Sequence, residues 1–480
     1  FRNLDKTNFM RYFFLLAASI SSFFIHGQSD YILSNLDSSK DDYAKIAMQI
    51  WEYAEMGYQE EKSSALLQNK LKESGFLVKA GVAGIPTAFV AEYNNGGPII
   101  AILGEYDALP GLSQKALPYK ITNGGRGGHA CGHHLFGTAS AAAAISLKKY
   151  IIKHRIKGTV RYYGCPAEEG GSGKVYMTRA GLFDDVDIAL HWHADDENSA
   201  NPRPALANKS AKFRFYGRSA HAAGAPEEGR SALDAVEAMN YMTNLMREHM
   251  DMSARIHYVI TRGGEAPNVV PDFAEVYYYS RHPKREKVVA LFDRIVKAAE
   301  GAALGTGTKM EYEMIGGTHD LLHVPTLQQI VHRNFTKIGG FTYNDQELDF
   351  AKKISATLNK PLDMKYIHDV APYDMNPKGI GGSTDVGDVS YKVPTAGLRG
   401  ATWVPGTPAH SWQAVAAGGT SIGLKGMMQA AKALTLSGIE LLEKPELIIK
   451  IKEEFKKIRG EDFDYIPLLG DREPALDYRN

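Results

Sequence analysis

The residues best suited to chemistry in this 480-residue chain fall in one short stretch, Gly127-Gly128-His129-Ala130-Cys131-Gly132-His133-His134. Imidazole and thiolate are the side chains that Zn²⁺ and related ions bind best, and the Cys-x-His spacing of Cys131 and His133 places two donors on one turn. The interleaved glycines let the backbone bend sharply and approach closely. The stretch therefore indicates a metal site, with a polar turn whose groups satisfy one another as the alternative.

Further candidate ligands follow strand-like segments elsewhere in the chain. Strands are expected over residues 98–103, 158–164 and 186–191, and a segment at 394–399 precedes one more candidate; the groups that follow are Glu105 and Asp107, Glu168 and Glu169, His191 and His193, and His410. Ligands bind beyond the carboxyl ends of the strands in open parallel α/β sheets, so we expect these groups at one edge of one sheet. Each alone has an ordinary explanation as a turn cap, a solvated acid or a surface histidine. Their coincidence at strand ends favours a site.

The pair Glu168-Glu169 is the most informative of these groups, because two neighbouring carboxylates on a turn cannot both point one way. One can bind a cation while the other accepts a proton from a water. A zinc-type ion lowers the pKa of a coordinated water to about 7. A carboxylate within hydrogen-bond reach can then act as the base. The pattern predicts machinery for hydrolysing an amide.

The elements around these residues predict an α/β fold. Strands alternate with helices such as 134–154, which favours a mostly parallel sheet flanked by helices. Near residue 201 the segment Asn201-Pro202-Arg203-Pro204 resembles a linker. Strand and helix patterns follow in the order of a small ferredoxin-like α+β unit, at residues 210–216, 231–250, 269–280, 285–299 and 309–315. We expect a discontinuous catalytic metal-binding domain, residues 35–207 and 318–480, with an inserted lid or dimerisation domain at 208–317.

Composition excludes several classes of protein. Lys plus Arg and Asp plus Glu both number 55, so the chain lacks the basic excess of a sequence-independent nucleic-acid binder. The two cysteines, Cys131 and Cys165, exclude a disulfide scaffold.

Residues 10–28 combine a positive residue, an apolar run and a small-residue exit, which predicts a secretory signal peptide. We expect a secreted or periplasmic protein without a membrane anchor once that segment is removed, and no nucleic-acid partner.

Eight motifs together resemble one family. They are GEYDALP, GGHACGHH, PAEEGGSGK, LHWH, GRSAHAAGAP, NVVPDFAEVYYYSR, GSTDVGD and TPAHSWQ. In order and content they look like the dizinc aminoacylase/carboxypeptidase family of metallopeptidases, over about residues 40 to 440. Within it they are similar to the amidohydrolase branch that contains p-aminobenzoyl-glutamate hydrolase and related dipeptidases.

The resemblance implies a role for each site residue. Two divalent metal ions, Zn²⁺ foremost and Mn²⁺ or Co²⁺ as alternatives, would be held by Cys131, which bridges or flanks them, and by His133, Glu169, His193 and His410. Glu168 would be the general base and then the acid, and Asp107 would orient a ligand imidazole. In the inserted domain, His221 would polarise the scissile carbonyl, often from the partner protomer of a homodimer. Asn268 and Arg281 would hold the substrate carboxylate, which suits a guanidinium.

Some positions stay open at this point. His134 stands where related hydrolases have Asp or Asn, and it either tunes the site or merely packs. The register of LHWH favours His193 over His191 as the ligand. A glutamate side chain on the substrate would need a second cationic contact, for which Lys174 and Arg399 are candidates.

The implied function is metal-dependent hydrolysis of the amide bond of an N-acyl or N-aroyl amino acid, with p-aminobenzoyl-glutamate as the leading substrate. A broader dipeptidase or aminoacylase is the alternative within enzymes, and a metal-binding homologue without catalysis is the alternative outside them. A paralogous subunit is a further partner that the sequence leaves open.

Overall fold

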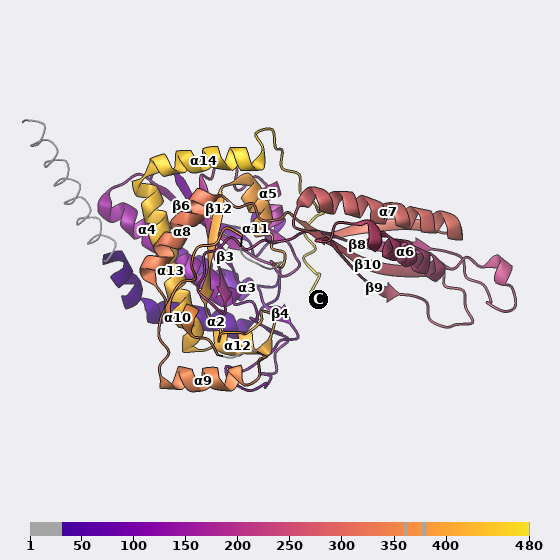
Figure 1. Ribbon diagram of the computed structural model, residues 1–480, viewed down its shortest axis with the longest axis horizontal. Helices are drawn as coiled ribbons and strands as arrows, with labels where there is room; N and C mark the ends of the chain where they lie inside the picture. The colour runs from indigo at the N-terminus through magenta and orange to yellow at the C-terminus, as the bar shows by residue number, and fades with distance from the viewer. Residues whose placement is uncertain (1–30, 360–361, 377–380, 480) are drawn as a thin grey trace, which may run out of the picture.

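The computed structural model describes residues 31–359, 362–376 and 381–479, so the signal segment expected at 10–28 lies outside the described residues. Figure 1 shows a large body and a smaller, elongated unit that projects from one side of it. Each of these two parts contains its own sheet. Across the described residues, every helix is too short or too polar to cross a membrane.

The sheet of the body is mostly parallel, which confirms the α/β fold expected from the sequence. Its strand order is β1 (Leu77–Ala80), β2 (Phe89–Asn94), β6 (Thr159–Cys165), β3 (Ile99–Glu105), β7 (Ile188–Asp195) and β12 (Thr395–Ala401). The last four strands of this order run parallel, whereas β1 and β2 form an antiparallel edge. Because the four parallel strands point the same way, their carboxyl ends meet at one edge.

Helices cover both faces of this sheet. In chain order they are α2 (Lys40–Tyr53), α3 (Glu61–Glu73), α4 (His133–His154), α5 (Gly173–Arg179), α8 (Pro325–Ile338), α9 (Asp345–Ser355), α10 (Lys365–His368), α11 (Val386–Lys392), α12 (Trp412–Gly418), α13 (Ser421–Glu443) and α14 (Pro445–Arg459). Residues of α4, α8 and α13 share the largest apolar core with one face of the sheet, and residues of α5 and α11 share a second core with the other. The run Ala141–Ala144 is fully buried, so small side chains let α4 lie close to the strands.

The projecting unit contains an antiparallel sheet in the order β11 (Lys309–Thr318), β8 (Ala207–Tyr216), β10 (Phe273–His282) and β9 (Arg255–Arg262). Helices α6 (Ala232–Met246) and α7 (Arg285–Thr306) pack on it around buried Phe213, Phe215 and Ile295. The sequence did not predict β9, because this edge strand buries only Ile256 and therefore lacks the alternation of a half-buried strand.

Glycine allows the Cys131 loop to approach the sheet. A two-stranded ribbon of β4 (Leu109–Pro110) and β5 (Gly127–Gly128) delivers this loop to the amino end of α4. Gly132 there has φ +75°, and a Cβ on it would lie 2.4 Å from Ala194 Cβ in β7. Any other residue would meet both the left-handed backbone and this contact, so Gly132 fixes how closely the loop approaches β7.

We expect Gly132→Ala to destabilise the body more than Gly81→Ala does. Gly81 has φ +67° but open space around its Cβ position, so it shares the backbone strain without the clash. Crowding at Gly132 should lower the free energy of unfolding by about 1–3 kcal/mol more than the control substitution. Thermal and denaturant midpoints of both variants measure this difference. Equal shifts in the two variants would show that the loop tolerates displacement from β7.

Candidate metal centre

Two groups of metal-type donors meet at Cys131. One group is Cys131, His133 and His193, and the other is Cys131, Glu169 and His410; within each group the ligand atoms lie within 4.8 Å of one another. We call these five residues the Cys131 cluster. The distance from Cys131 Sγ to His193 Nε2 is 3.3 Å. A thiolate shared by two donor sets is the arrangement expected of a ligand between two cations.

Asp107 organises one side of the Cys131 cluster. Its Oδ1 lies 2.8 Å from His133 Nδ1, and its Oδ2 accepts the backbone N–H of Glu169 at 2.9 Å. The carboxylate therefore fixes the ring of His133 so that Nε2 faces the cluster, and it also fixes the turn that carries Glu169. Such an outer carboxylate orients a ligand imidazole. The structure places Asp107 where the sequence expected an orienting residue.

His410 reaches the cluster from a distant part of the chain. Its backbone N–H donates to Ala130 O at 3.0 Å, and its Nε2 lies 3.2 Å from Glu169 Oε1. Its φ of +58° is a left-handed conformation that is uncommon for a non-glycine residue. Strained backbone of this kind occurs where neighbouring structure holds a functional group in place.

The structure distinguishes the histidines of the two histidine-rich motifs. His193 Nδ1 donates to Ala194 O at 2.7 Å, which leaves Nε2 directed to Cys131, whereas His191 joins neither donor group. His134 Nε2 contacts Gly418 O at 3.0 Å, and His129 Nε2 contacts Ile50 O at 3.0 Å. His134 therefore packs as a buried structural histidine beside the cluster, one of the two roles that the sequence left open.

Glu168 lies next to the Cys131 cluster, but its own neighbours include a second buried carboxylate. It forms a donor group with Glu105 and His133. Burial, followed by the charge of Glu105, holds the pKa of the Glu168 carboxyl well above its usual range. A carboxyl group with a raised pKa takes up and releases a proton more readily near neutral pH than an exposed one does. Glu168, with its raised pKa, thus lies beside Glu169, which belongs to a donor group with Cys131 and His410.

A buried lysine compensates part of the negative charge. Lys174 Nζ lies 2.6 Å from Glu105 Oε1 and 2.6 Å from Asp385 Oδ1, and all three side chains are essentially inaccessible. Burial opposes the charge of Lys174, but Asp385 and Glu105 outweigh it and hold its pKa well above the usual range. Lys174 is therefore part of the supporting structure. The suggestion that Lys174 contacts a substrate glutamate is wrong, because its ammonium group is inaccessible and already pairs with two carboxylates, those of Glu105 and Asp385.

The residues of the Cys131 cluster fit divalent cations. Two buried polar atoms in it, His133 Nε2 and Glu169 Oε1, make no hydrogen bond of good geometry, although they lie 3.0 Å from Glu105 Oε2 and 3.2 Å from His410 Nε2. Burial, together with the neighbouring Glu169, raises the pKa of the Cys131 thiol well above its usual range. A cation would satisfy these atoms and favour the charged thiolate and carboxylate. Thiolate and imidazole donors favour Zn²⁺, and mixed donors also accept Mn²⁺ or Co²⁺.

The cluster opens into a cavity of about 500 Å³ between the body and the projecting unit. Cys131, Glu168 and His410 of the body line this cavity, and so does Arg281 on β10 of the projecting unit. His221 and Asn268 do not line this cavity. They lie near each other within the projecting unit, where Ala222 N donates to Asn268 O at 3.0 Å and His221 pairs with Val269. One chain therefore brings the expected ligands, base and Arg281 together, but not these two residues.

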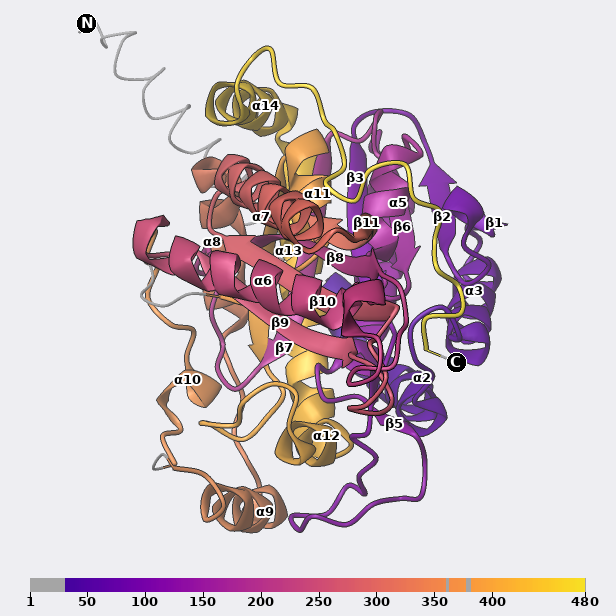
Figure 2. The same ribbon diagram turned by 90° about the vertical axis from the view of Figure 1, so that its right-hand side faces the viewer.

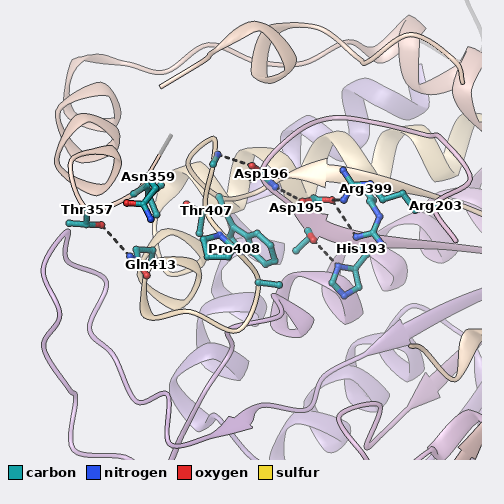
Figure 3. Close-up of a pocket in the computed structure, with 15 residues that line it drawn as sticks. His193, Asp195, Asp196, Arg203, Thr357, Asn359, Arg399, Thr407, Pro408 and Gln413 are labelled. Carbon is teal, nitrogen blue, oxygen red and sulfur yellow. Dashed lines mark hydrogen bonds and ion pairs between the residues drawn. The ribbon is translucent and has the colours of Figure 1, made fainter. Parts of the chain in front are cut away.

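A second cavity of about 570 Å³ adjoins the first at His193 and Arg399 (Figure 3). Here Arg399 Nη1 lies 3.3 Å from Asp195 Oδ2, which also accepts Arg203 Nη1 at 3.0 Å. Arg399 is thus within reach of a ligand but already paired with a carboxylate. The sequence suggested Arg399 as a second cationic contact for a glutamate substrate. Its pairing with Asp195 makes it a weaker partner for a substrate carboxylate than an unpaired arginine would be.

Three residues at the site were not identified from the sequence. Asp385 lies in the motif GSTDVGD, so this motif could have indicated a residue of the site. The contact between Asp385 and Lys174 was not predictable from the sequence. Tyr478 and Arg479 reach the carbonyl of Glu169 across more than 300 residues of sequence. Their local sequence contains no motif that could have indicated this contact.

Comparisons with known proteins identify the family of the chain. Residues 101–349 match the model of peptidase family M20/M25/M40. The chain is 42% identical over 451 residues to one of the subunits of p-aminobenzoyl-glutamate hydrolase of Escherichia coli, covering 88% of this chain and 94% of that protein. It is 30% identical to the Xaa-Arg dipeptidase of Mus musculus, covering 88% of this chain and 90% of that protein.

A similar solved structure is that of a dinuclear metal-binding peptidase of the M20 family from Bacillus subtilis. The TM-score is 0.57 at 18% identity, with 85% of this chain and 99% of that chain covered. Fold and sequence together define a metallohydrolase that acts on amide or peptide bonds. The chain belongs to peptidase family M20/M25/M40.

We expect His193→Ala to lose bound metal and His191→Ala to retain it. His193 directs Nε2 at Cys131 Sγ, whereas His191 lies on the cavity wall outside both donor groups. After reconstitution with Zn²⁺, His193→Ala should bind about one equivalent less metal per chain than the unmodified protein. Elemental analysis measures the content, and circular dichroism checks that both variants are folded. Loss of metal in His191→Ala alone would assign the ligand role to the other histidine.

Proposed function

We propose that this protein hydrolyses the amide bond of an N-acyl or N-aroyl amino acid, with p-aminobenzoyl-glutamate as the leading substrate. The observation that carries the proposal is the sharing of Cys131 between two donor groups, with Glu168 beside them in the same cavity. The 42% identity to the p-aminobenzoyl-glutamate hydrolase protein supports the choice of substrate.

Two divalent ions held by the Cys131 cluster would supply Lewis acidity, which polarises the amide carbonyl and makes a water more acidic. Glu168 removes the proton of the attacking water and delivers it to the leaving nitrogen. Its raised pKa suits both steps, because the carboxyl group must change protonation state twice in each cycle. Arg281, which β10 of the projecting unit contributes to the cavity, binds the carboxylate of the amino-acid portion.

A broader dipeptidase is the second candidate. The 30% identity to Xaa-Arg dipeptidase over 88% of the chain favours it. A panel of acylated amino acids separates the two functions. Equal rates across acyl groups, with no preference for glutamate, would favour the dipeptidase or aminoacylase over the aminobenzoyl-glutamate hydrolase.

We also propose that the protein is a homodimer through the projecting unit. His221 and Asn268 lie outside the cavity of their own chain, so a partner protomer is the simplest source of these groups for each site. Within the described residues β9 pairs only with β10, and it exposes Val259 and Ile260 by 55% and 41%. An exposed apolar edge strand can pair with a second copy. Export directed by residues 10–28 remains part of the proposal.

Glu168→Gln should slow turnover strongly while leaving metal bound. Removing the base should lower kcat by about 10²- to 10⁴-fold. Steady-state kinetics with p-aminobenzoyl-glutamate and elemental analysis of the same preparation measure both quantities.

Glu169→Gln is the matched control for this substitution, because it changes the adjacent carboxyl group by the same single atom. This variant should lose metal as well as activity, since Glu169 belongs to a donor group. An unchanged kcat in metal-loaded Glu168→Gln would remove Glu168 from the mechanism.

Val259→Lys should convert the dimer to monomers, because it places a charge on the exposed edge of β9. If His221 acts across the interface, kcat/KM should fall by about 10²- to 10³-fold, as expected when a group that polarises the carbonyl is removed. Sedimentation velocity and kinetics measure the two effects. Ile449→Lys on α14, where the side chain is 63% exposed, is the control and should change neither. A fully active monomer would contradict the proposed interface.

A further inference from the structure

Residues 463–479 form a segment that we call the strap. It leaves the body after α14, crosses the junction with the projecting unit and ends beside the metal centre. Figure 1 shows it in yellow between the two parts, and Figure 2 shows it descending from α14 toward α3. No part of the strap is a helix or a strand. Its position therefore depends on the contacts that its side chains and backbone make along the way.

Apolar contacts fix the strap at the junction. Leu468 packs with Ala207 and Val288 at the base of the projecting unit, whereas Leu469 is buried in the second core of the body. Gly317, near the end of β11, makes room for the strap, because a Cβ on it would lie 2.6 Å from the backbone of Leu468. Successive leucines of the strap are thus buried against the two different parts of the molecule.

Polar contacts extend this attachment toward the site. Arg179 donates to Gly470 O at 3.1 Å and to Arg472 O at 2.8 Å. Arg472 donates to Ile315 O on β11 and lies 3.5 Å from Glu313. The strap is therefore held by α5 of the body and by β11 of the projecting unit.

The end of the strap contacts the turn that carries the metal-type ligand. Tyr478 donates its hydroxyl to Glu169 O at 3.0 Å, and Arg479 donates to the same carbonyl. The ring of Tyr478 packs against Tyr58 at 5.5 Å, and the guanidinium of Arg479 lies 4.7 Å from the Tyr478 ring. These contacts place Arg479 in the wall of the cavity that contains Cys131 and Glu168.

The charges of the cavity distinguish Arg479 from most of its neighbours. The four arginines that line it are Arg203, Arg281, Arg399 and Arg479. Arg203 and Arg399 both pair with Asp195. In the described part of the chain, neither Arg281 nor Arg479 lies within ion-pair distance of a carboxylate, and the Nε atom of each is buried without a hydrogen bond. Two guanidiniums thus face the cavity with charge and donors to spare.

A guanidinium that has a buried donor without a hydrogen bond and no carboxylate partner is costly unless a ligand anion satisfies it. Arg281 on β10 is the group that we assign to the α-carboxylate of the substrate. Because Arg479 comes from the strap and Arg281 from β10, a second anionic group on the same substrate would satisfy Arg479. A cationic substrate side chain would instead be repelled by the unpaired positive charge.

We infer that Arg479 binds the side-chain carboxylate of the substrate, so that the strap selects N-acyl derivatives of acidic amino acids over neutral and basic ones. This inference rests on the proposed amidohydrolase function and deepens it. It makes Arg479 a specificity-determining residue supplied by a segment far in sequence from the catalytic motifs. The role that the sequence suggested for Lys174 or Arg399 then belongs to an arginine that has no carboxylate partner of its own.

The test compares two substrates that differ only in the amino-acid side chain, p-aminobenzoyl-glutamate and p-aminobenzoyl-alanine. Loss of a charge-assisted contact in Arg479→Gln should lower kcat/KM for the glutamate substrate by about 10- to 100-fold, chiefly through KM. The loss for the alanine substrate should be at least tenfold smaller. Arg479→Glu should lower the preference for glutamate further, because it reverses the charge.

Arg472→Gln is the matched control. It weakens the strap at β11 without removing a group from the cavity, so it should affect both substrates by the same factor. A direct binding measurement by calorimetry, with p-aminobenzoyl-glutamate and metal-loaded Glu168→Gln protein, should show the same weakening when Arg479→Gln is added. This readout does not depend on turnover.

Equal losses for both substrates in Arg479→Gln would overturn the inference and leave Arg479 with a structural role at the Glu169 turn. No loss for either substrate would overturn it as well. Failure of the metal-loaded, unmodified protein to hydrolyse either substrate would instead refute the proposed function. The two failures are therefore distinguishable within one set of assays.

Discussion

The structure depends on placing several acidic groups close together away from water. Glu105, Asp107 and Asp385 are buried beside Cys131 at one sheet edge. Burial raises the pKa of the Glu105 carboxyl and of the Cys131 thiol, so it opposes their charged forms. Part of the compensation is internal. Lys174 lies between Glu105 and Asp385, and Asp107 pairs with the ring of His133. Glu169 has only the imidazole of His410 beside its carboxylate among the described residues, and cations are the species that would balance it and Cys131.

The fold makes this gathering possible because parallel strands end at the same edge. The turn after β6 carries Glu168 and Glu169, β7 carries His193, and the loop after β12 carries His410. The loop before α4 adds Cys131, and Gly132 permits its close approach to β7. The projecting unit then contributes Arg281 to the cavity. Each piece of the site therefore comes from a separate connection, held in position by one sheet.

The sequence predicted most of this arrangement because the relevant signals are local. The helix expected at 134–154 is α4, because its alanine-rich sequence favours a helix whatever its surroundings. Strand β9 was missed because an exposed edge strand carries little periodic signal. Lys174 was misassigned because its side chain pairs with Asp385, which is 211 residues away in the sequence. Arg479 lies 310 residues from Glu169 and was invisible for the same reason.

The central claim is that Cys131 lies between two cations at the edge of the sheet. Crystals of the zinc-reconstituted protein, measured on both sides of the zinc absorption edge, test it most directly. The account predicts two anomalous peaks, each about 2.3 Å from Cys131 Sγ, one beside His133 and His193 and the other beside Glu169 and His410. A single peak, or peaks remote from Cys131, would contradict it.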